Sequence, residues 1–367
     1  MVFHMRYLDE RVWVILRELR PLIERQHIDI TKWQTKKKLF MRPEEADQDS
    51  MPWEAFDSST DRWYGKDVYY WFRAQFTVPQ SMDGKCIFLK IHTQIEEWDD
   101  GRNPQFLLFV DGKAVQGQDM NHREVRLTDC AEAGRTYTLD LQAYTGILHN
   151  EFALKVTADE TDLALLKLYY DLKAPADAYH YKRMPEGRTR SLLIEALNGA
   201  INKLDLRNPH SPEFDASVAE AQAYIDEHLY QNPELIGHDE IIASCIGHTH
   251  IDVAWWWTVS QTREKTARSF STVLKLMDEY PDYKFMSSQP QLYVFLKERY
   301  PEVYAKIKER VKEGRWIPEG GMWLEADCNL TSGESLVRQF LYGKKFFKDE
   351  FDIDSKILWL PDVFGYS

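Results

Sequence analysis

The sequence predicts a multidomain protein with an antiparallel β-sandwich, a helical connector, and then an α/β region with parallel strands. Three changes of pattern along the chain predict this order. Short β-rich runs bounded by turn residues fill residues 67–160, and apolar residues at helical spacing dominate residues 161–238. Strand-like and helix-like segments then alternate through residues 239–367. We expect residues 1–66 to add an N-terminal helix and an irregular wrap against the sandwich.

The N-terminal helix is predicted over residues 5–28. Its apolar positions at helical spacing are Leu8, Val12, Ile15, Leu16, Leu19, Leu22 and Ile23. Charged residues interrupt every apolar stretch of this segment, so it lacks the continuous apolar core of a signal peptide. No later stretch is long enough to span a bilayer. Residues 29–66 are polar and carry tryptophans without a clear period, which is why an irregular wrap is expected there.

The sandwich is predicted by β-rich runs separated by tight turns. Pro79 ends the first run, Asp83-Gly84 precedes the second, and Asp111-Gly112 is a hairpin signal within the third. Regular spacing of this kind indicates an antiparallel sandwich. We expect its exposed aromatic side chains to pack against neighbouring elements, and a sugar-binding surface is the less favoured alternative.

Four strand segments alternate with helices in the last third of the chain. These segments are EIIASCIG, YKFMSSQ, RWIPEGG and SKILWLPD. Such repeats form a parallel sheet with right-handed crossovers. A parallel sheet of this size would leave its last edge uncovered, which predicts half of a barrel or sheet, or a longer chain. An open edge also predicts pairing with another copy, and hence a homo-oligomer.

Charge and cysteine usage narrow the class of protein. The 46 basic and 59 acidic residues give a net charge of −13, which disfavours nucleic acid or an anionic membrane as the main partner. The cysteines Cys86, Cys130, Cys245 and Cys328 are scattered singly, without a CxxC pair. This usage is typical of a reducing compartment, so we expect a cytoplasmic protein.

Ligand-type side chains follow the first predicted strand. Ligands of parallel α/β sheets bind at the carboxyl ends of the strands. His248, His250 and Asp252 are two residues apart, so on an extended backbone they point the same way. Imidazole nitrogen together with carboxylate is typical of zinc sites. The alternative is a capped strand end at which the histidines only form hydrogen bonds.

Other candidates lie on the same face. Asp362 follows the fourth predicted strand and can reach an ion held by the first, although aspartates often follow strands as turn or cap residues. Trp323 and the run Trp255–Trp257 could stack on the apolar face of a sugar ring, but at most one or two would touch it. Asp327 could hydrogen-bond sugar hydroxyls, with a turn role as the equal alternative.

The motifs GHTHIDVAW, GGMWLEAD and LPDVFGYS, in this order and spacing, resemble the metal-binding and nucleophile motifs of glycoside hydrolase family 38 α-mannosidases. The resemblance is strong over residues 240–367. The sandwich and connector are more weakly similar to the N-terminal extension of the cytosolic and bacterial branch. The resemblance implies that the α/β region is the first part of a seven-stranded β/α barrel. The family's last zinc-ligand histidine and general-acid aspartate lie further along, so we expect an N-terminal fragment that is inactive alone.

The resemblance also implies roles for single residues. His250 and Asp252 correspond to zinc ligands, and Asp362 to the residue that both binds zinc and attacks the anomeric carbon. His248 is not a ligand in the family pattern, which leaves it a supporting or packing role. Trp255 matches a tryptophan that stacks in the mannose subsite. One Zn²⁺ per active site is implied, for which another divalent ion could substitute.

The function implied is that of a retaining α-mannosidase, with a mannose-containing oligosaccharide as its partner. Zinc would bind two vicinal hydroxyls of a terminal mannose while Asp362 attacks C1. One alternative is a zinc-dependent carbohydrate deacetylase, in which the metal activates water and acetate is released. The other alternative is a non-catalytic sugar-binding module built on the sandwich.

Overall fold

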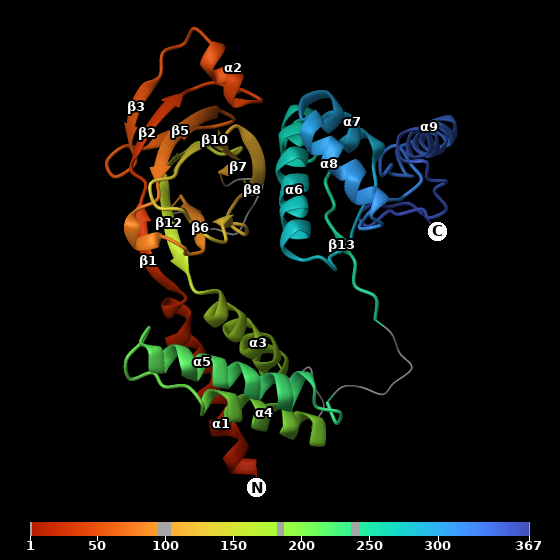
Figure 1. Cartoon of the computed structure of the whole chain (residues 1–367). Coiled ribbons are helices and arrows are strands. Elements are labelled where there is room, and N and C mark those ends of the chain that lie inside the picture. Colours follow the sequence, from red (N-terminus) through yellow and green to blue (C-terminus); the bar gives the residue numbers. More distant parts are fainter. Residues whose placement is uncertain (1, 94–103, 182–186, 236–242, 367) are drawn as a thin grey trace.

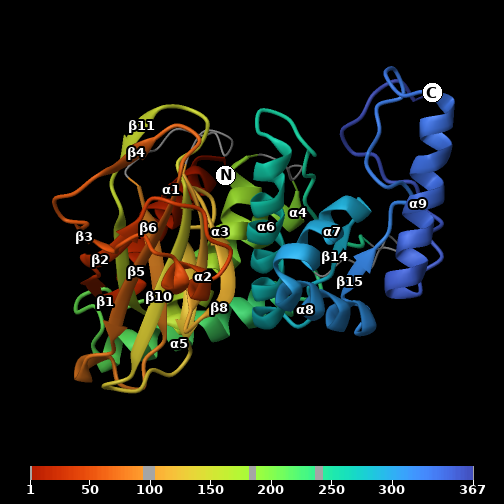
Figure 2. The same cartoon turned by 90° about the horizontal axis from the view of Figure 1, so that it is seen from above.

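The computed structural model describes residues 2–93, 104–181, 187–235 and 243–366. Figure 1 shows a sandwich, a helical bundle at one end of it, and an α/β region at its side. Figure 2, seen from above, shows helix α6 (Val259–Glu279) between the sandwich and the rest of the α/β region. Within the described residues, none of the helices combines the length and the apolar character needed to cross a membrane.

The sandwich consists of two antiparallel sheets, as predicted. Their strand orders are β1-β12-β6-β9 and β3-β2-β5-β10-β7-β8. The strands are β1 (Glu24–Asp29), β2 (Lys32–Lys36), β3 (Glu54–Asp57), β5 (Tyr69–Thr77), β6 (Ile87–His92), β7 (Gln105–Val110), β8 (Lys113–Gln118), β9 (Glu124–Thr128), β10 (Thr136–Tyr144) and β12 (Lys155–Thr161). Smaller elements are the strand pair β4 (Trp63–Gly65) and β11 (Asn150–Phe152), and the helices α2 (Pro43–Gln48) and η2 (Gln80–Met82). Apolar side chains from both sheets form one buried core between them.

The irregular wrap predicted over residues 29–66 is wrong for much of its length. Strand β2 pairs with β3 and β5, and Trp33 lies in the sandwich core. The alternation of apolar and polar residues that marks a strand is obscured in β2, because its last residue, Lys36, is charged and yet buried. Its ammonium group donates to the backbone oxygen of Ala46 at 2.6 Å and lies 4.9 Å from the ring centroid of Trp53. A lysine that is buried through these contacts looks like a surface residue in the sequence.

The N-terminal helix is shorter than predicted and packs with the helical connector. Helix α1 (Val2–Leu19) is followed by the 3-10 turn η1 (Arg20–Leu22), in which Pro21 has no N–H to continue the helix. The chain then enters β1 instead of remaining helical to residue 28. The other helices of the bundle are α3 (Leu163–His180), α4 (Arg188–Ile201), α5 (Pro212–Ile225) and the π-helical turn η3 (Asp226–Tyr230). Val12 and Leu16 of α1 share a buried core with these helices.

The α/β region contains three parallel strands in the order β13-β14-β15. They are β13 (Gly247–His248), β14 (Phe285–Ser287) and β15 (Trp316–Pro318), and the helices after α6 are α7 (Pro290–Arg299), α8 (Pro301–Lys312) and α9 (Gly333–Phe351). The first predicted strand, 240–247, lies partly outside the described residues. The fourth, 355–362, forms only one parallel bridge, between Gly320 and Leu358. Closure into a seven-stranded barrel stays a prediction.

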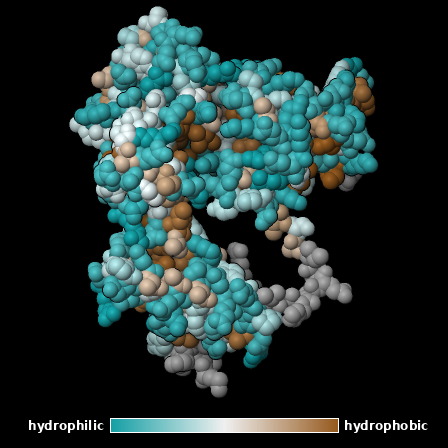
Figure 3. All heavy atoms as spheres, viewed as in Figure 1, coloured by the Kyte–Doolittle hydropathy of each residue, from teal (hydrophilic) through white to brown (hydrophobic). Residues whose placement is uncertain are grey.

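The fourth segment is held by a side chain instead of a strand ladder. The carboxylate of Glu319 accepts the backbone N–H groups of Lys356 and Ile357 at 2.9 and 3.0 Å, and also the hydroxyl of Ser355. These donors are therefore satisfied without a neighbouring strand. Exposed apolar side chains gather on α9 and the segment after it, including Val337, Leu341, Ile357, Leu358 and Phe364. Figure 3 shows this hydrophobic surface at the end of the α/β region farthest from the sandwich. The predicted homo-oligomer stays a prediction.

The sandwich and the α/β region share a buried core. Trp71 and Phe109 of the larger sheet pack in one cluster with Phe270 of α6 and Tyr293 of α7. Strand β8 also contacts α6, because the hydroxyl of Thr272 on α6 donates to the backbone oxygen of Gly117 on β8 at 3.2 Å. This shared core fixes α6, whose first turn supports the candidate site described below.

Gly117→Ala is expected to loosen this contact and to lower the free energy of unfolding by about 1–3 kcal/mol, as overpacking does elsewhere. An added Cβ would lie 2.6 Å from both the Cβ and the backbone oxygen of Arg268, and backbone cannot move aside as a side-chain tip can. Urea unfolding measures the loss. Gly333→Ala is the matched control because its Cβ would meet nothing within 4 Å. Equal stabilities for the two variants would contradict the close approach.

Candidate active site

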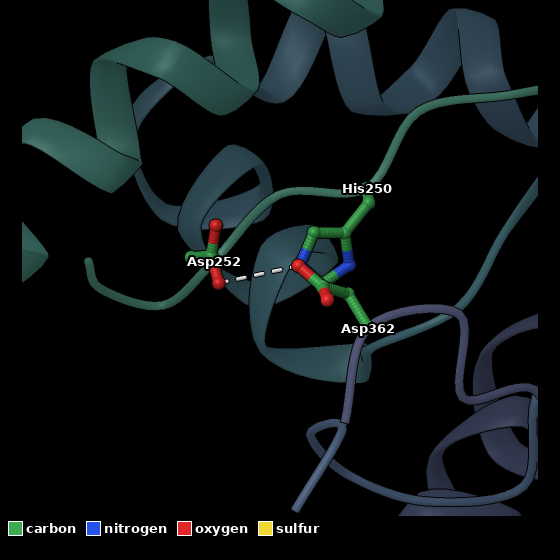
Figure 4. A group of neighbouring side chains, drawn as sticks. All are labelled: His250, Asp252 and Asp362. Atoms are coloured by element: carbon green, nitrogen blue, oxygen red, sulfur yellow. Dashed lines mark ion pairs between the residues drawn. The ribbon is translucent and has the colours of Figure 1, made fainter. Parts of the chain in front are cut away.

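His250, Asp252 and Asp362 converge on one point (Figure 4). The His250 Nε2 atom lies 3.2 Å from Asp252 Oδ1 and 3.9 Å from Asp362 Oδ2. One potential ligand atom from each residue lies within 4.8 Å of the others. His250 and Asp252 follow strand β13, whereas Asp362 follows the fourth segment, so the structure brings together the three residues that the sequence predicts as metal ligands.

The loop after β13 is held by hydrogen bonds to its backbone. The side chain of Gln289, at the start of α7, donates to the backbone oxygen of Ile251 at 3.0 Å. The ring N–H of Trp257 donates to the backbone oxygen of Asp252 at 3.2 Å. Helix α6 begins directly afterwards, with Thr258 as its N-cap. A contact from α7 and a contact within the loop therefore fix the conformation from which His250 and Asp252 project.

Carboxylates surround the imidazole of His250. Its Nδ1 atom forms an ion pair with Glu325 Oε2 at 2.8 Å, and Glu325 Oε1 accepts the hydroxyl of Ser288 at 2.8 Å. The Glu325 carboxylate raises the pKa of His250 to about 9, and Asp252 adds to the rise while burial opposes it. One cation beside three carboxylates leaves a net negative charge when all are ionised. Such a charge favours a divalent cation among these side chains.

The donor set fits a zinc ion. Neither ring nitrogen of His250 forms a hydrogen bond, although Nδ1 lies 2.8 Å from Glu325 and Nε2 lies 3.2 Å from Asp252. A buried ring nitrogen without a partner is costly in the metal-free protein, and coordination would satisfy it. Imidazole nitrogen and carboxylate oxygen are both common zinc ligands. The side chains of His250, Asp252 and Asp362 are 22%, 31% and 61% exposed, so the group opens to solvent on the Asp362 side.

His248 lies outside this group, so the prediction from spacing that it joins His250 and Asp252 is wrong. The ring N–H of Trp359 donates to His248 Nε2 at 3.1 Å, and His248 Nδ1 lies 3.0 Å from the backbone oxygen of Met286. Both nitrogens are therefore engaged by neighbouring strand segments. This arrangement agrees with the supporting role that the family pattern gives to His248.

The predicted sugar-binding residues differ in how they are presented. Trp255 is 65% exposed and its ring lies against Trp257, with centroids 5.7 Å apart. Trp323 is half-buried, since its ring N–H donates to Gln291 at 3.2 Å and its ring packs edge-on against a phenylalanine of α9. The carboxylate of Asp327 accepts the backbone N–H of Asn329 at 2.7 Å, which is the turn role given as its alternative. Trp255 is thus the best presented of the three for stacking on a ligand.

Glu325 was not singled out from the sequence, although it lies in the quoted motif GGMWLEAD. A signal was available: a histidine that binds a metal through one ring nitrogen usually engages a carboxylate or carbonyl with the other. Glu325 follows β15, the neighbour of β14 in the sheet, at the same end as His250. A search of the strand ends for that second partner would have identified it.

Comparison with known proteins agrees with the motifs. Residues 240–367 match the family described as "Glycosyl hydrolases family 38 N-terminal domain". Alpha-mannosidase G of Dictyostelium discoideum is 31% identical over 318 residues, which are 81% of this chain and 28% of that protein. Alpha-mannosidase 2C1 of Homo sapiens is 30% identical over 346 residues, 88% of this chain and 31% of that protein.

The chain spans only 28% and 31% of the length of these two relatives. Among solved structures, a β-glucuronidase from an uncultured Clostridium sp. aligns with 38% of this chain and 30% of its own. Its TM-score is 0.27 at 11% identity, which is too low to assign a fold.

Proposed function

This chain belongs to glycosyl hydrolase family 38 through residues 240–367, and we propose that it forms part of a retaining α-mannosidase. The proposed substrate is a terminal α-linked mannose of an oligosaccharide. The observation that carries the proposal is the convergence of His250, Asp252 and Asp362 from two distant motifs. The similarity to two α-mannosidases over more than four fifths of this chain supports it.

In this proposal His250 Nε2 and one oxygen each of Asp252 and Asp362 hold a zinc ion. When bound, zinc would supply a Lewis acid that orients vicinal mannose hydroxyls and stabilises charge near the reacting carbon. His250 and Asp252 are the more buried of the three residues and anchor the site. Asp362 is the most exposed, so its carboxylate can also face a sugar. Trp255 offers an exposed ring on which an apolar sugar face can stack.

The proposed reaction has two steps with Asp362 as nucleophile. Its carboxylate oxygen attacks C1 of mannose as the glycosidic C1–O bond breaks, and the leaving oxygen takes a proton from a general acid. Water then attacks C1 of the glycosyl ester, loses its proton to the conjugate base of the general acid, and restores the Asp362 carboxylate. Two displacements at C1 retain the anomeric configuration, so α-mannose is released.

The proposed location is the cytoplasm. All four cysteines are free thiols, and Cys130 and Cys245 are exposed, a state that a reducing compartment maintains.

The test is hydrolysis of an aryl α-mannoside, measured on the full reading frame that contains this chain and on residues 1–367 alone. Proton NMR of the first product should show the α anomer of mannose from the full protein. Release of acetate from an acetylated sugar, without mannose, would instead identify a deacetylase. Mannoside binding without turnover that is unchanged in Asp362→Ala would favour the sugar-binding module.

A further inference from the structure

Of the three carboxylates that lie beside His250 in the described part of the chain, Glu325 faces away from the converging ligand atoms. It contacts Nδ1 of the imidazole, whereas Asp252 and Asp362 lie on the Nε2 side. A ring held at Nδ1 presents Nε2 in a fixed direction. Glu325 therefore stands where a supporting group, and not a ligand, is expected.

The surroundings of Glu325 suit a fixed support. Its side chain is only 4% exposed, so its ionised form requires partners that replace water. One oxygen accepts the hydroxyl of Ser288, at the end of β14, and the other faces His250. The two partners restrict the carboxylate to one orientation, which it transmits to the imidazole ring.

The loop that carries Glu325 is itself anchored to the segment that leads to Asp362. Glu319, on the same loop, accepts the N–H groups at the start of the fourth segment, and Gly320 bridges to Leu358 in that segment. The backbone N–H of Trp359 also donates to Gly320 at 3.3 Å. The loop between β15 and α9 thus contacts both parts of the site, the one bearing His250 and the one leading to Asp362.

We propose that Glu325, fixed by Ser288, is a positioning residue that orients His250 for metal binding. The inference rests on the proposed function, because His250 must be a metal ligand for it to hold. It assigns Glu325 no contact with substrate. Its predicted effect is on metal affinity, since a loose imidazole must lose rotational freedom each time the ion binds.

The experiment measures zinc affinity on the whole chain by competition with a chromophoric chelator. Glu325→Gln is expected to weaken zinc binding by about 10–100-fold, the range typical of supporting residues at metal sites. Ser288→Ala keeps the Glu325 carboxylate but removes the hydroxyl that donates to it, so a smaller loss of zinc affinity is expected. Glu334→Gln is the matched control because Glu334 is 71% exposed on α9 and forms an ion pair with Arg338, away from the site.

A second measurement separates positioning from general stability. A ligand that binds the folded protein raises the melting temperature by an amount that grows with the logarithm of its affinity, so the zinc-induced rise should shrink in Glu325→Gln. A purely structural role would lower the metal-free melting temperature and leave that rise unchanged, which would overturn the inference. If Glu325→Gln fails to fold, the zinc affinity of folded Ser288→Ala tests the inference instead. A loss of affinity supports the inference, and wild-type affinity overturns it.

The outcomes distinguish this inference from the proposed function. Wild-type zinc affinity in Glu325→Gln, with binding lost in His250→Ala, would overturn the role of Glu325 and leave the metal site standing. Zinc binding that His250→Ala does not change would overturn the metal site and this inference together. An equal loss in Glu334→Gln would show that the effect is not specific to Glu325 and would also overturn the inference.

Discussion

Asp362→Asn is expected to lower kcat by several powers of ten in the enzyme that contains this chain, with the fold intact. The amide has nearly the same shape as the carboxylate, but it cannot attack C1 and is a poorer metal ligand. Loss of a nucleophile costs far more than loss of one binding contact. The side chain is 61% exposed, so the substitution leaves no buried charge unpaired and little stability should be lost. Steady-state kinetics and a thermal melt measure the two effects separately.

Asp327→Asn is the matched control for this substitution. The side-chain oxygen of asparagine can still accept the N–H of Asn329, so the turn at Asp327 should persist. We expect this variant to change KM more than kcat. In the wild type, a slow fluorinated mannosyl substrate should label the peptide that contains Asp362. Labelling of another carboxylate, or release of the inverted anomer, would make Asp362 a metal ligand only and exclude the retaining mechanism.

The antiparallel sheets of the sandwich could be predicted because their strands alternate between turns that carry strong local signals. Asp111 and Gly112, for example, both have positive φ, as a tight hairpin turn requires. Strand β2 could not be predicted in this way. The burial of Lys36 depends on Ala46 and Trp53, which contact Lys36 only in the folded protein. A local pattern indicates which residues are apolar, but it does not show which charged residues find buried partners.

The fourth segment, residues 355–362, was predicted as a strand but forms only a single bridge. Its apolar run SKILWLPD has the composition of a strand, but Glu319 satisfies its first N–H groups. Strand formation requires a neighbour that supplies a ladder, and the composition of one segment cannot show whether that neighbour is beside it. Within the described residues, only the bridge from Gly320 to Leu358 is formed there.

The candidate site was largely accessible from the sequence because strand ends are a physical landmark. His250, Asp252 and Asp362 all follow predicted parallel strands, and the carboxyl ends of such strands meet at one edge of the sheet. The structure brings these three residues together. The direction of each side chain was harder to predict. Residue spacing grouped His248 with His250, yet Trp359 and Met286 contact the two ring nitrogens of His248. Glu325 was missed because the prediction considered the ligands of the ion and not the partner that His250 engages with its other ring nitrogen.

His250→Ala is expected to remove specific zinc binding, with a loss greater than the about 10–100-fold expected for a supporting residue such as Glu325. The substitution deletes the only nitrogen donor of the group and leaves two carboxylates, of which Asp362 is mostly exposed. Isothermal titration of the chain with zinc measures the loss. Asp252→Ala should act in the same direction. Tight stoichiometric binding that persists in both variants would place the metal elsewhere.

The pH dependence of zinc binding tests the same residue independently. Because Glu325 raises the pKa of His250 to about 9, the metal-free imidazole is protonated at neutral pH and zinc must displace its proton. The proton competes less as pH rises, so the apparent zinc affinity should increase about tenfold per pH unit between about pH 6 and 8. Above the pKa of His250 this increase should stop. The residual zinc affinity of His250→Ala should lack the slope, since the imidazole whose proton zinc displaces is absent from that variant. A wild-type affinity that does not change between these pH values would show that zinc does not bind through His250.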